Sequence, residues 1–232
     1  MKKILITFFL FISTYICFSQ TVLLHQEVKD TTLGKRGPNL KNFGHFYFGI
    51  GFIMGEPENK GAEINYGFSK NILVGYRYKL KLNQVLAIGF DMDYNASSFF
   101  IKQHPLKTIP DTLLHDIEKI NFGNVGLNGY IRFNYGKRGN RIGNFIDLGA
   151  YGNYVFSARH FTKDENQQGN IVKTTTSHLG YYNKTNYGLL MRIGFNRYVL
   201  FGNYRWSNHF KDSYLYPELP RYTVGFQIGF HK

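Results

Sequence analysis

The sequence contains little cysteine and proline and no long hydrophobic run. It has 1 Cys and 6 Pro in 232 residues. The single thiol, Cys17, directly follows an N-terminal apolar run, and we expect it to be removed together with that run. The mature chain then has no disulfide, no thiol nucleophile and no thiolate metal ligand. No segment reaches the roughly eighteen apolar residues that mark a membrane helix, so an exported chain is a soluble periplasmic protein or a β-barrel.

The N-terminus has the three parts of a secretory signal peptide. Lys2 and Lys3 are followed by the apolar run from Ile4 to Ile16, which is too short to cross a bilayer. Small residues then predict cleavage between Ser19 and Gln20, and the bulky Ile16 before Cys17 argues against a lipoprotein. We predict a signal peptide at 1–19, a periplasmic extension at 20–42 whose residues 34–38 look like a flexible tether, and a barrel at 43–232.

Acidic residues are few, because 15 Asp and Glu stand against 28 Lys and Arg, for a net charge of +13. Removal of Lys2 and Lys3 leaves +11. The basic residues are dispersed through strands and loops, so we expect no nucleic-acid partner. Anionic lipid headgroups, or solvent, are the expected surroundings of this charge.

Aromatic residues and glycine are abundant, with 22 Phe, 18 Tyr and 25 Gly, and they alternate. In 222–230, Tyr, Val, Phe, Ile and Phe occupy one face, and Thr, Gly, Gln and Gly the other. Such alternation indicates β-strands. It predicts strands at 43–54, 68–80, 84–96, 121–135, 142–158, 181–196, 198–208 and 221–231.

The connections between these segments alternate in length. Short connections lie at 81–83, 136–141 and 196–197, and longer polar connections at 55–67, 97–120, 159–180 and 209–220. Tight periplasmic turns and long external loops are typical of membrane barrels. The sequence therefore predicts an all-β fold: an eight-stranded antiparallel up-and-down transmembrane barrel in the cell outer membrane, with both termini in the periplasm.

A soluble lipocalin-like barrel is the competing fold, with the aromatic face turned inward. An eight-stranded barrel is only wide enough for side chains to fill it, so the Gly- and Asn-rich face suits the interior better than the Phe-rich face. Aromatic rings near strand ends also mark membrane interfaces. These residues are Tyr78, Tyr94, Tyr135, Tyr198, Trp206 and Tyr222.

Charged residues of both signs share the predicted inner face. They form a candidate interior charge network of Arg77, Asp91, Asp93, Arg132, Asp147, Arg192 and Arg205. Buried charges need partners of opposite sign, so these side chains are expected to pair. Such a network fills a narrow barrel more often than it forms an ion path, which favours a plug over a pore.

The last hairpin carries the most specific local pattern. The run from Tyr204 to Lys211, the stretch from Pro217 to Arg221 and the strand from Val224 to Phe230 resemble the closing hairpin of the PorT-like outer-membrane barrel family of Bacteroidetes. That family includes a protein needed for type IX secretion. The resemblance implies a small barrel in the outer membrane, with an accessory role in secretion or envelope assembly.

The same hairpin contains the sharpest enzyme pattern. Outer-membrane lipid A deacylases carry a His-x-Ser-Asn motif; here Ser207 and Asn208 are present but Arg205 replaces the histidine. Arginine stays protonated and cannot act as the base, and His209 follows the serine instead of preceding it. We therefore expect no enzymatic activity, with Glu218 as a loop residue rather than a catalytic acid.

No cofactor or metal site is expected. The histidines at 104, 115, 160, 178 and 209 are scattered through loop regions, and the glycines at 123, 126 and 129 belong to a strand instead of a phosphate-binding turn. The predicted function is a structural or accessory component with outer-membrane lipid and envelope proteins as partners. The alternatives are a narrow transport pore, a lipid A-modifying enzyme, and adhesion through the loops that contain 99–101 and 163–178.

Overall fold

The computed structural model describes residues 36–57, 60–137 and 139–231. The predicted signal peptide and residues 20–35 of the predicted extension lie outside the described residues. The elements are β1 (Asn42–Met54), β2 (Lys70–Lys81), β3 (Leu86–Phe100), β4 (Ile117–Tyr135), β5 (Asn144–Glu165), β6 (Ile171–Ser177), β7 (Thr185–Phe195), β8 (Tyr198–Arg205), a short 3-10 helix η1 (Asp212–Tyr214) and β9 (Tyr222–Phe230). Within the described part of the chain, no helix has the length and apolar character needed to cross a membrane.

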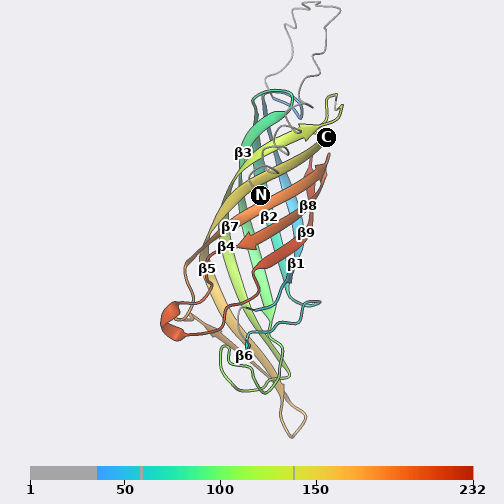
Figure 1. Cartoon of the computed structure of the whole chain (residues 1–232). Helices are drawn as coiled ribbons and strands as arrows, with labels where there is room; N and C mark the ends of the chain where they lie inside the picture. Colours follow the sequence, from blue (N-terminus) through green and yellow to red (C-terminus); the bar gives the residue numbers. More distant parts are fainter. Residues whose placement is uncertain (1–35, 58–59, 138, 232) are drawn as a thin grey trace, which may run out of the picture. The chain divides into compact units, whose positions relative to one another are not determined.

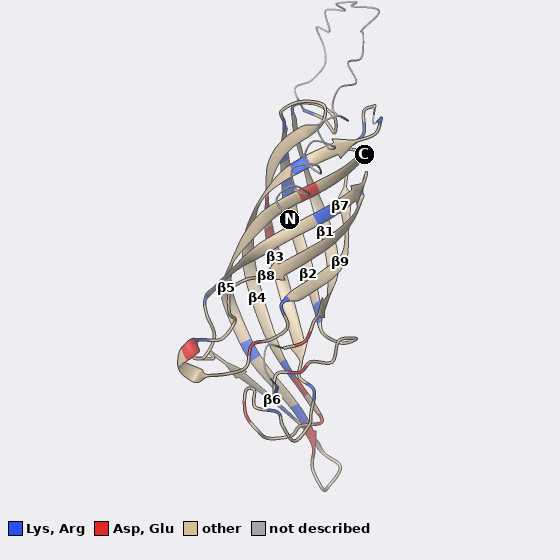
Figure 2. Cartoon of the chain, in the orientation of Figure 1, with Lys and Arg blue, Asp and Glu red and all other residues tan. Residues whose placement is uncertain are grey.

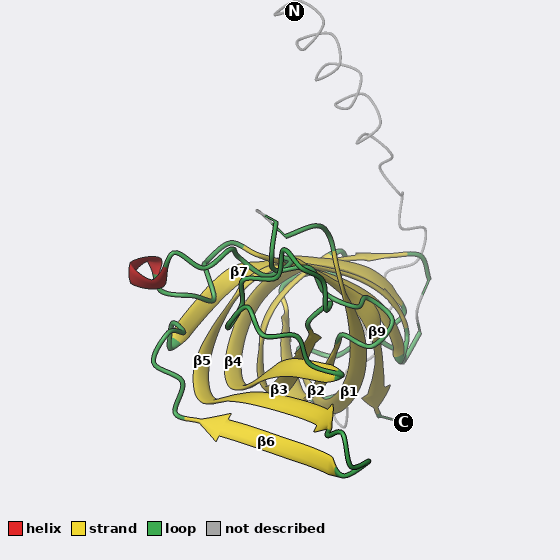
Figure 3. Ribbon diagram, turned by 90° about the horizontal axis from the view of Figure 1, so that it is seen from below, coloured by secondary structure: helices red, strands yellow, loops and turns green. Residues whose placement is uncertain are grey.

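The strands form a closed antiparallel ring. Each strand pairs with its neighbour in the order β4-β3-β2-β1-β9-β8-β7-β5, and the pairing of β4 with β5 closes the circle (Figure 1). β6 lies outside the ring and pairs with β5 alone (Figure 3). The prediction of an eight-stranded antiparallel up-and-down barrel is confirmed.

Strand ends differ from the prediction at one end of the barrel. β3 continues to Phe100, β4 begins at Ile117 and β5 runs to Glu165, so much of the predicted loops 97–120 and 159–180 is strand. β6 was wholly missed. Past the barrel wall the pattern reverses in β4, where Ile120 and Phe122 are buried on the inner face and Lys119 and Asn121 lie on the outer face, so the alternation of the wall strands does not continue there. In contrast, β7 begins later and β8 ends earlier than predicted.

The outer face of the ring is apolar and the inner face is polar. Phe46, Leu127 and Phe226 are more than 60% exposed, whereas Arg77 and Arg132 are 1% exposed inside. The alternation therefore has the predicted direction, and the lipocalin-like arrangement with aromatics inside is wrong. An apolar surface that continues around the whole barrel is far larger than water-soluble monomers expose.

Glycines on the inner face make room for tyrosines from neighbouring strands. Gly75 lies opposite Tyr47 and Gly89 lies opposite Tyr130 in the strand register. A Cβ atom on Gly75 would approach the Tyr47 hydroxyl to 2.7 Å, and one on Gly89 would approach the Tyr130 ring to 2.4 Å. Both distances are below van der Waals contact, so the narrow interior needs glycine at these positions to hold the rings.

The chain that precedes β1 is hydrogen-bonded to the end of the barrel with short turns. A two-residue turn joins β7 to β8, and Asn196 adopts a φ of 58° there, which asparagine tolerates better than most residues. Lys79 donates from Nζ to the Pro38 carbonyl at 2.5 Å, and Lys81 donates to the Asn39 carbonyl at 2.9 Å. Residues 36–41 are therefore anchored at this end, in contrast to the predicted flexible tether at 34–38, of which 34–35 lie outside the described residues.

The end with long loops contains its own hydrophobic core. The loops 55–69, 101–116, 178–184 and 206–221 fold over this end and bury apolar side chains together with the extended parts of β3, β4 and β5. The buried members are Ile53, Ala62, Ile64, Phe99, Ile101, Ile109, Ile120, Phe122, Val155, Ala158, Leu179, Phe210 and Leu219. These loops form a cap, and Phe99 and Ile101, predicted to lie in an external loop, belong to its core.

Candidate functional site

The barrel interior is the candidate site, and its centre is an ion-pair network of five residues. Arg77 Nε lies 3.1 Å from Asp91 Oδ1, and Arg132 donates from Nε and from its terminal nitrogen to the two Asp147 oxygens at 2.7 and 2.8 Å. Arg192 contacts both carboxylates: its guanidinium bonds Asp91 and lies 3.7 Å from Asp147 Oδ2. All five side chains are at most 3% exposed. Figure 2 marks the charged residues along the strands.

The network crosses the lumen. Arg77 faces Asp91 on adjacent strands, and Asp147 lies between Arg132 and Arg192 in the register of β4, β5 and β7. These pairs follow the wall, but the bond from Arg192 on β7 to Asp91 on β3 joins strands that are not neighbours in the ring. Arg77 also donates across β1 to Gln227 Oε1 on β9, at 2.7 Å. Side chains from both sides of the barrel therefore meet in its centre.

Tyrosine and phenylalanine rings pack on the arginines of this network. The Arg77 guanidinium lies 4.5 Å from the Tyr47 ring centroid, and that of Arg132 lies 3.5 Å from the Phe145 centroid. The Tyr130 ring lies 5.3 Å from both Arg132 and Arg192. Such contacts stabilise desolvated guanidinium groups and fill the remaining cross-section.

Two residues of the predicted charge network lie outside this cluster. Asp93 is held by neutral donors: Asn128 Nδ2 at 2.6 Å, Tyr47 Oη at 3.2 Å and Asn95 Nδ2 at 3.2 Å. Arg205 lies at the long-loop end of β8 and pairs there with Glu218 at 2.7 Å. The structure thus brings five of the seven predicted residues into one network and gives the other two separate environments.

A polar chamber of about 70 Å³ separates the network from the cap. Its lining includes Asp93, Tyr151 and the asparagines at 71, 95, 124, 128, 153, 186 and 203. Asn124 Nδ2 donates to Asn95 Oδ1 at 2.7 Å, and Asn153 Nδ2 to Asn186 Oδ1 at 2.9 Å. Among the described residues, Asn124 Oδ1 and Asn186 Nδ2 have no hydrogen-bond partner. A chamber of this size and polarity suits a few buried water molecules.

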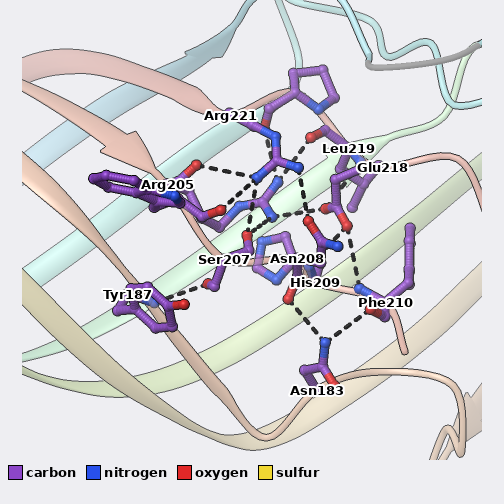
Figure 4. A network of polar contacts seen from close by, with 12 residues as sticks. Asn183, Tyr187, Arg205, Ser207, Asn208, His209, Phe210, Glu218, Leu219 and Arg221 are labelled. Atoms are coloured by element: carbon purple, nitrogen blue, oxygen red, sulfur yellow. Dashed lines mark hydrogen bonds and ion pairs between the residues drawn. The ribbon is translucent and has the colours of Figure 1, made fainter. Parts of the chain in front are cut away.

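The lid of this chamber is built around Arg205 and Glu218 (Figure 4). Arg205 donates to the Glu218 carboxylate at 2.7 Å and to the Ser207 and Leu219 carbonyls at 2.7 and 2.8 Å. The second Glu218 oxygen accepts the backbone N–H of His209 at 2.9 Å. Arg221 adds a bond to Asn208 Oδ1 at 2.7 Å. These bonds hold the 206–221 loop across the long-loop end of the barrel. The residues that resemble the deacylase motif thus have a structural role.

The serine, histidine and glutamate of that motif do not form a catalytic triad. The Ser207 hydroxyl accepts the Tyr187 backbone N–H at 2.9 Å, and Glu218 binds the His209 backbone rather than its ring. The His209 ring instead stacks on Phe122, with centroids 4.6 Å apart and planes at 3°. No described contact links the His209 ring to Ser207, so the arrangement provides no base for this hydroxyl.

His209 makes the lid sensitive to acid. Burial, followed by the nearby charges of Arg205 and Arg221, lowers the His209 pKa well below its ordinary value of 6.5. An opened loop binds a proton below that ordinary value while the closed loop does not, so stability is present above pH 6.5 and is lost as the pH falls.

We expect opening of the 206–221 loop to become easier by up to about 1.4 kcal/mol per pH unit below 6.5. Hydrogen exchange of the loop amides between pH 7.5 and 5 measures this free energy. H209F keeps the stacked ring but has no titrating group, so its opening free energy should stay flat over this range. An equal pH dependence in H209F would assign the effect to other groups.

A second buried ionic cluster lies in the cap and was missed in the sequence. Glu118 is 1% exposed; its carboxylate accepts a hydrogen bond from Lys107 Nζ at 2.5 Å and lies 2.7 Å from His160 Nε2. Asp111, His115 and Glu118 bring oxygen and nitrogen atoms within 4.8 Å of one another, a spacing that can hold a metal ion. The Lys107 ammonium, however, lies between Glu118 and Asp111, at 3.6 Å from the latter. The lysine therefore supplies the positive charge that this group of ligands would otherwise take from a metal.

The cluster depends on the fold, because Lys107 is 11 residues and His160 is 42 residues from Glu118 in the chain. Glu118 lies on β4 and His160 on β5, where the two strands pair beyond the predicted strand ends. Lys107 comes from the 101–116 loop. The sequence signal for this cluster is the acidic Glu118 beside the apolar residues Ile117 and Ile120, inside the predicted loop 97–120.

Comparison with known proteins finds a distant likeness in structure. No family model matches the chain, and no curated protein matches it. Among solved structures, the chain is similar to Ail, the attachment invasion locus protein of Yersinia pestis, in its crystal structure with the heparin analogue sucrose octasulfate. The two chains are 10% identical with a TM-score of 0.31, and the match covers 80% of this chain and 94% of Ail. This distance is too great for Ail's ligand to be carried over.

Proposed function

We propose that the chain is a closed outer-membrane barrel with a structural or accessory role in an envelope or secretion complex. The observation that carries the proposal is the ion-pair network that joins opposite walls across the lumen through Arg192 and Asp91. A solute path would have to break these bonds and expose charges that are now desolvated and paired, at a cost of several kcal/mol. The cap covers one end of the barrel, and residues 38 and 39 are hydrogen-bonded at the other.

The outer face supports a membrane location. Large apolar side chains point outward on every strand of the ring, for example Met92 on β3 at 59% exposure and Tyr187 on β7 at 58% exposure. An apolar band on the outside and a polar interior are the pattern of an outer-membrane barrel. Short turns on the periplasmic side would place the cap outside the cell, with both termini in the periplasm.

The resemblance of the last hairpin to PorT-like barrels supports an accessory role in secretion, and β6 offers a surface for a protein partner. All seven residues of β6 are exposed, and five of them are β-branched: Ile171, Val172, Thr174, Thr175 and Thr176. One edge of β6 pairs with β5, and no described strand pairs with the other. A free edge of this kind can accept an extended segment of another protein.

Planar-bilayer recording tests the closed barrel. The purified protein should show no channel activity above the lipid background at neutral pH. The lumen is narrow and is crossed by paired side chains, so D91N should also fail to produce a large, steady conductance unless the barrel unfolds. A large single-channel conductance of the unchanged protein would favour the transport-pore alternative and contradict the proposal.

Deletion of the gene tests the accessory role. The proposal expects loss of secretion or of envelope integrity, with restoration by the intact protein and weaker restoration by T175P, which blocks edge pairing at the centre of β6. E165Q, an exposed change at the end of β5, is the matched control. Unimpaired secretion and envelope integrity in the deletion strain would remove the accessory role. Altered lipid A mass on overexpression would favour the enzyme alternative instead.

A further inference from the structure

The part of the sheet that extends past the barrel wall has two chemically different faces. In β4, the side chains of Glu118 and Ile120 point inward and are buried, while Lys119 between them points outward. In β5, Arg159 and Lys163 share the outward face with Lys119, as the strand register shows. Lys173 on β6 lies directly opposite Lys163 and extends the same face. These four residues, Lys119, Arg159, Lys163 and Lys173, form the basic patch.

The charges of the basic patch are not balanced by the protein. None of the four residues makes an ion pair with a described residue. Lys163 and Lys173 face each other as direct cross-strand partners, an arrangement of like charges that destabilises a sheet. The acidic Glu118 is turned to the inner face, and Glu165, the acidic residue on the outward face, lies at the tip beyond Lys163. The unpaired charges on this face thus favour an anion from outside the chain.

Aromatic rings fix the direction of one of these lysines. The Lys119 ammonium lies 4.9 Å from the Phe161 ring centroid and 5.4 Å from that of Phe100, which face it from β5 and β3. Contacts with two rings hold the ammonium close to the outward surface of the sheet and restrict its motion. The patch is therefore partly preorganised, unlike a set of lysines on mobile loops.

The position of the patch identifies its occupant. The outward face that carries Lys119 continues along β4 through Val125, Leu127 and Ile131, which are exposed and apolar. On β5, a bulge lies where the apolar band ends at Phe156, and Arg159 follows three residues later. The basic residues therefore begin directly beyond the apolar band. Side chains at this height beside a membrane barrel face the headgroups of the surrounding lipid.

We propose that the basic patch binds the phosphate groups of phosphorylated glycolipid in the outer leaflet next to β4, β5 and β6. The proposal rests on the membrane location under the proposed function and names a lipid partner for that surface. Lys119 and Arg159 lie nearest the apolar band and bind the phosphates closest to the acyl chains. Lys163 and Lys173 lie farther out and share phosphates of the sugar region, which removes the repulsion between them.

The test compares two variants of the full barrel that carry the same change in net charge. The patch variant is K119Q/R159Q/K163Q/K173Q, and the control is K60Q/K102Q/K137Q/R141Q, whose side chains are exposed outside the patch. Each protein is reconstituted in phosphatidylcholine nanodiscs with bisphosphorylated lipid A or with dephosphorylated lipid A. Native mass spectrometry then counts the lipid A molecules that remain bound.

The proposal expects the unchanged protein and the control to retain bisphosphorylated lipid A over the dephosphorylated form, and the patch variant to lose at least about tenfold of that preference. Inorganic phosphate at millimolar concentration should not compete, because the apolar band holds the acyl chains beside the patch. Equal retention by both variants would overturn the proposal. Competition by free phosphate would assign the patch to a soluble phosphate compound.

Failure of the proposed function gives a different result. A protein that does not fold as a membrane barrel would show no heat-dependent mobility on gels and would not enter nanodiscs at all. A folded barrel that retains no lipid A overturns the phosphate site alone. Binding of an extended peptide at β6 without lipid A preference would favour a protein partner for this face.

Discussion

Replacing Asp91 by asparagine is expected to destabilise the barrel by about 3–5 kcal/mol. Asp91 accepts from Arg77 and from Arg192, and each of these arginines is at most 3% exposed. The amide of D91N is neutral. It therefore removes the negative charge that Arg77 and Arg192 share in the centre of the lumen. Urea unfolding in lipid vesicles, followed by the fluorescence of Trp206, measures the free energy of unfolding.

D93N is the matched control for this prediction. Asp93 lies on the same face of the same strand, two residues away, and its loss changes the net charge equally. Its partners are the neutral donors Tyr47, Asn95 and Asn128, which can also bond an amide oxygen. D93N should therefore cost only about 1–2 kcal/mol. Equal losses for the two variants would contradict the central place of the ion-pair network.

An arginine in the apolar band is expected to have the second largest effect. Phe226 lies at the middle of β9, points outward and is 66% exposed. If this face contacts hydrocarbon, F226R should lower the free energy of unfolding in lipid by about 2–4 kcal/mol, because a charge at the centre of a bilayer is poorly solvated. The same unfolding titration in vesicles measures the effect.

Y222R tests the depth dependence on the same strand and face. Tyr222 lies at the end of β9 and contacts Tyr204, with ring centroids 5.0 Å apart. Near the membrane interface an arginine can reach the headgroups, so its cost should fall to about 0–1 kcal/mol beyond the lost ring contact. If F226R were as stable as the unchanged protein, the outer face would be in water rather than in lipid.

The alternation of residue types predicted the ring because every barrel strand separates two environments. In β9, the sequence from Tyr222 to Phe230 places each large apolar residue outward and each small or polar residue inward, as the structure does. The same contrast predicted the faces of Arg77 and Arg132. Where both faces meet water or a mixed core, as along β6 with its seven exposed residues, the contrast is lost and the strand was not found.

The charge network was predictable as a set of residues but not as a set of bonds. Pairing of Arg77 with Asp91 requires the register of β2 and β3, and the bond between Asp91 and Arg192 also requires closure of the ring. Neither follows from spacing along the chain. The position of Arg205 on the inner face predicts that it joins the same network. In the structure it pairs instead with Glu218, which lies in the predicted loop 209–220.

The most direct test of a closed membrane barrel is an SDS gel of purified outer membranes, with unheated and boiled samples compared. We expect the protein in this fraction, with a different mobility before and after boiling, because a closed ring of strands resists SDS until it is heated. Recovery of the protein in the soluble periplasmic fraction, with the same mobility in both samples, would contradict a closed membrane barrel.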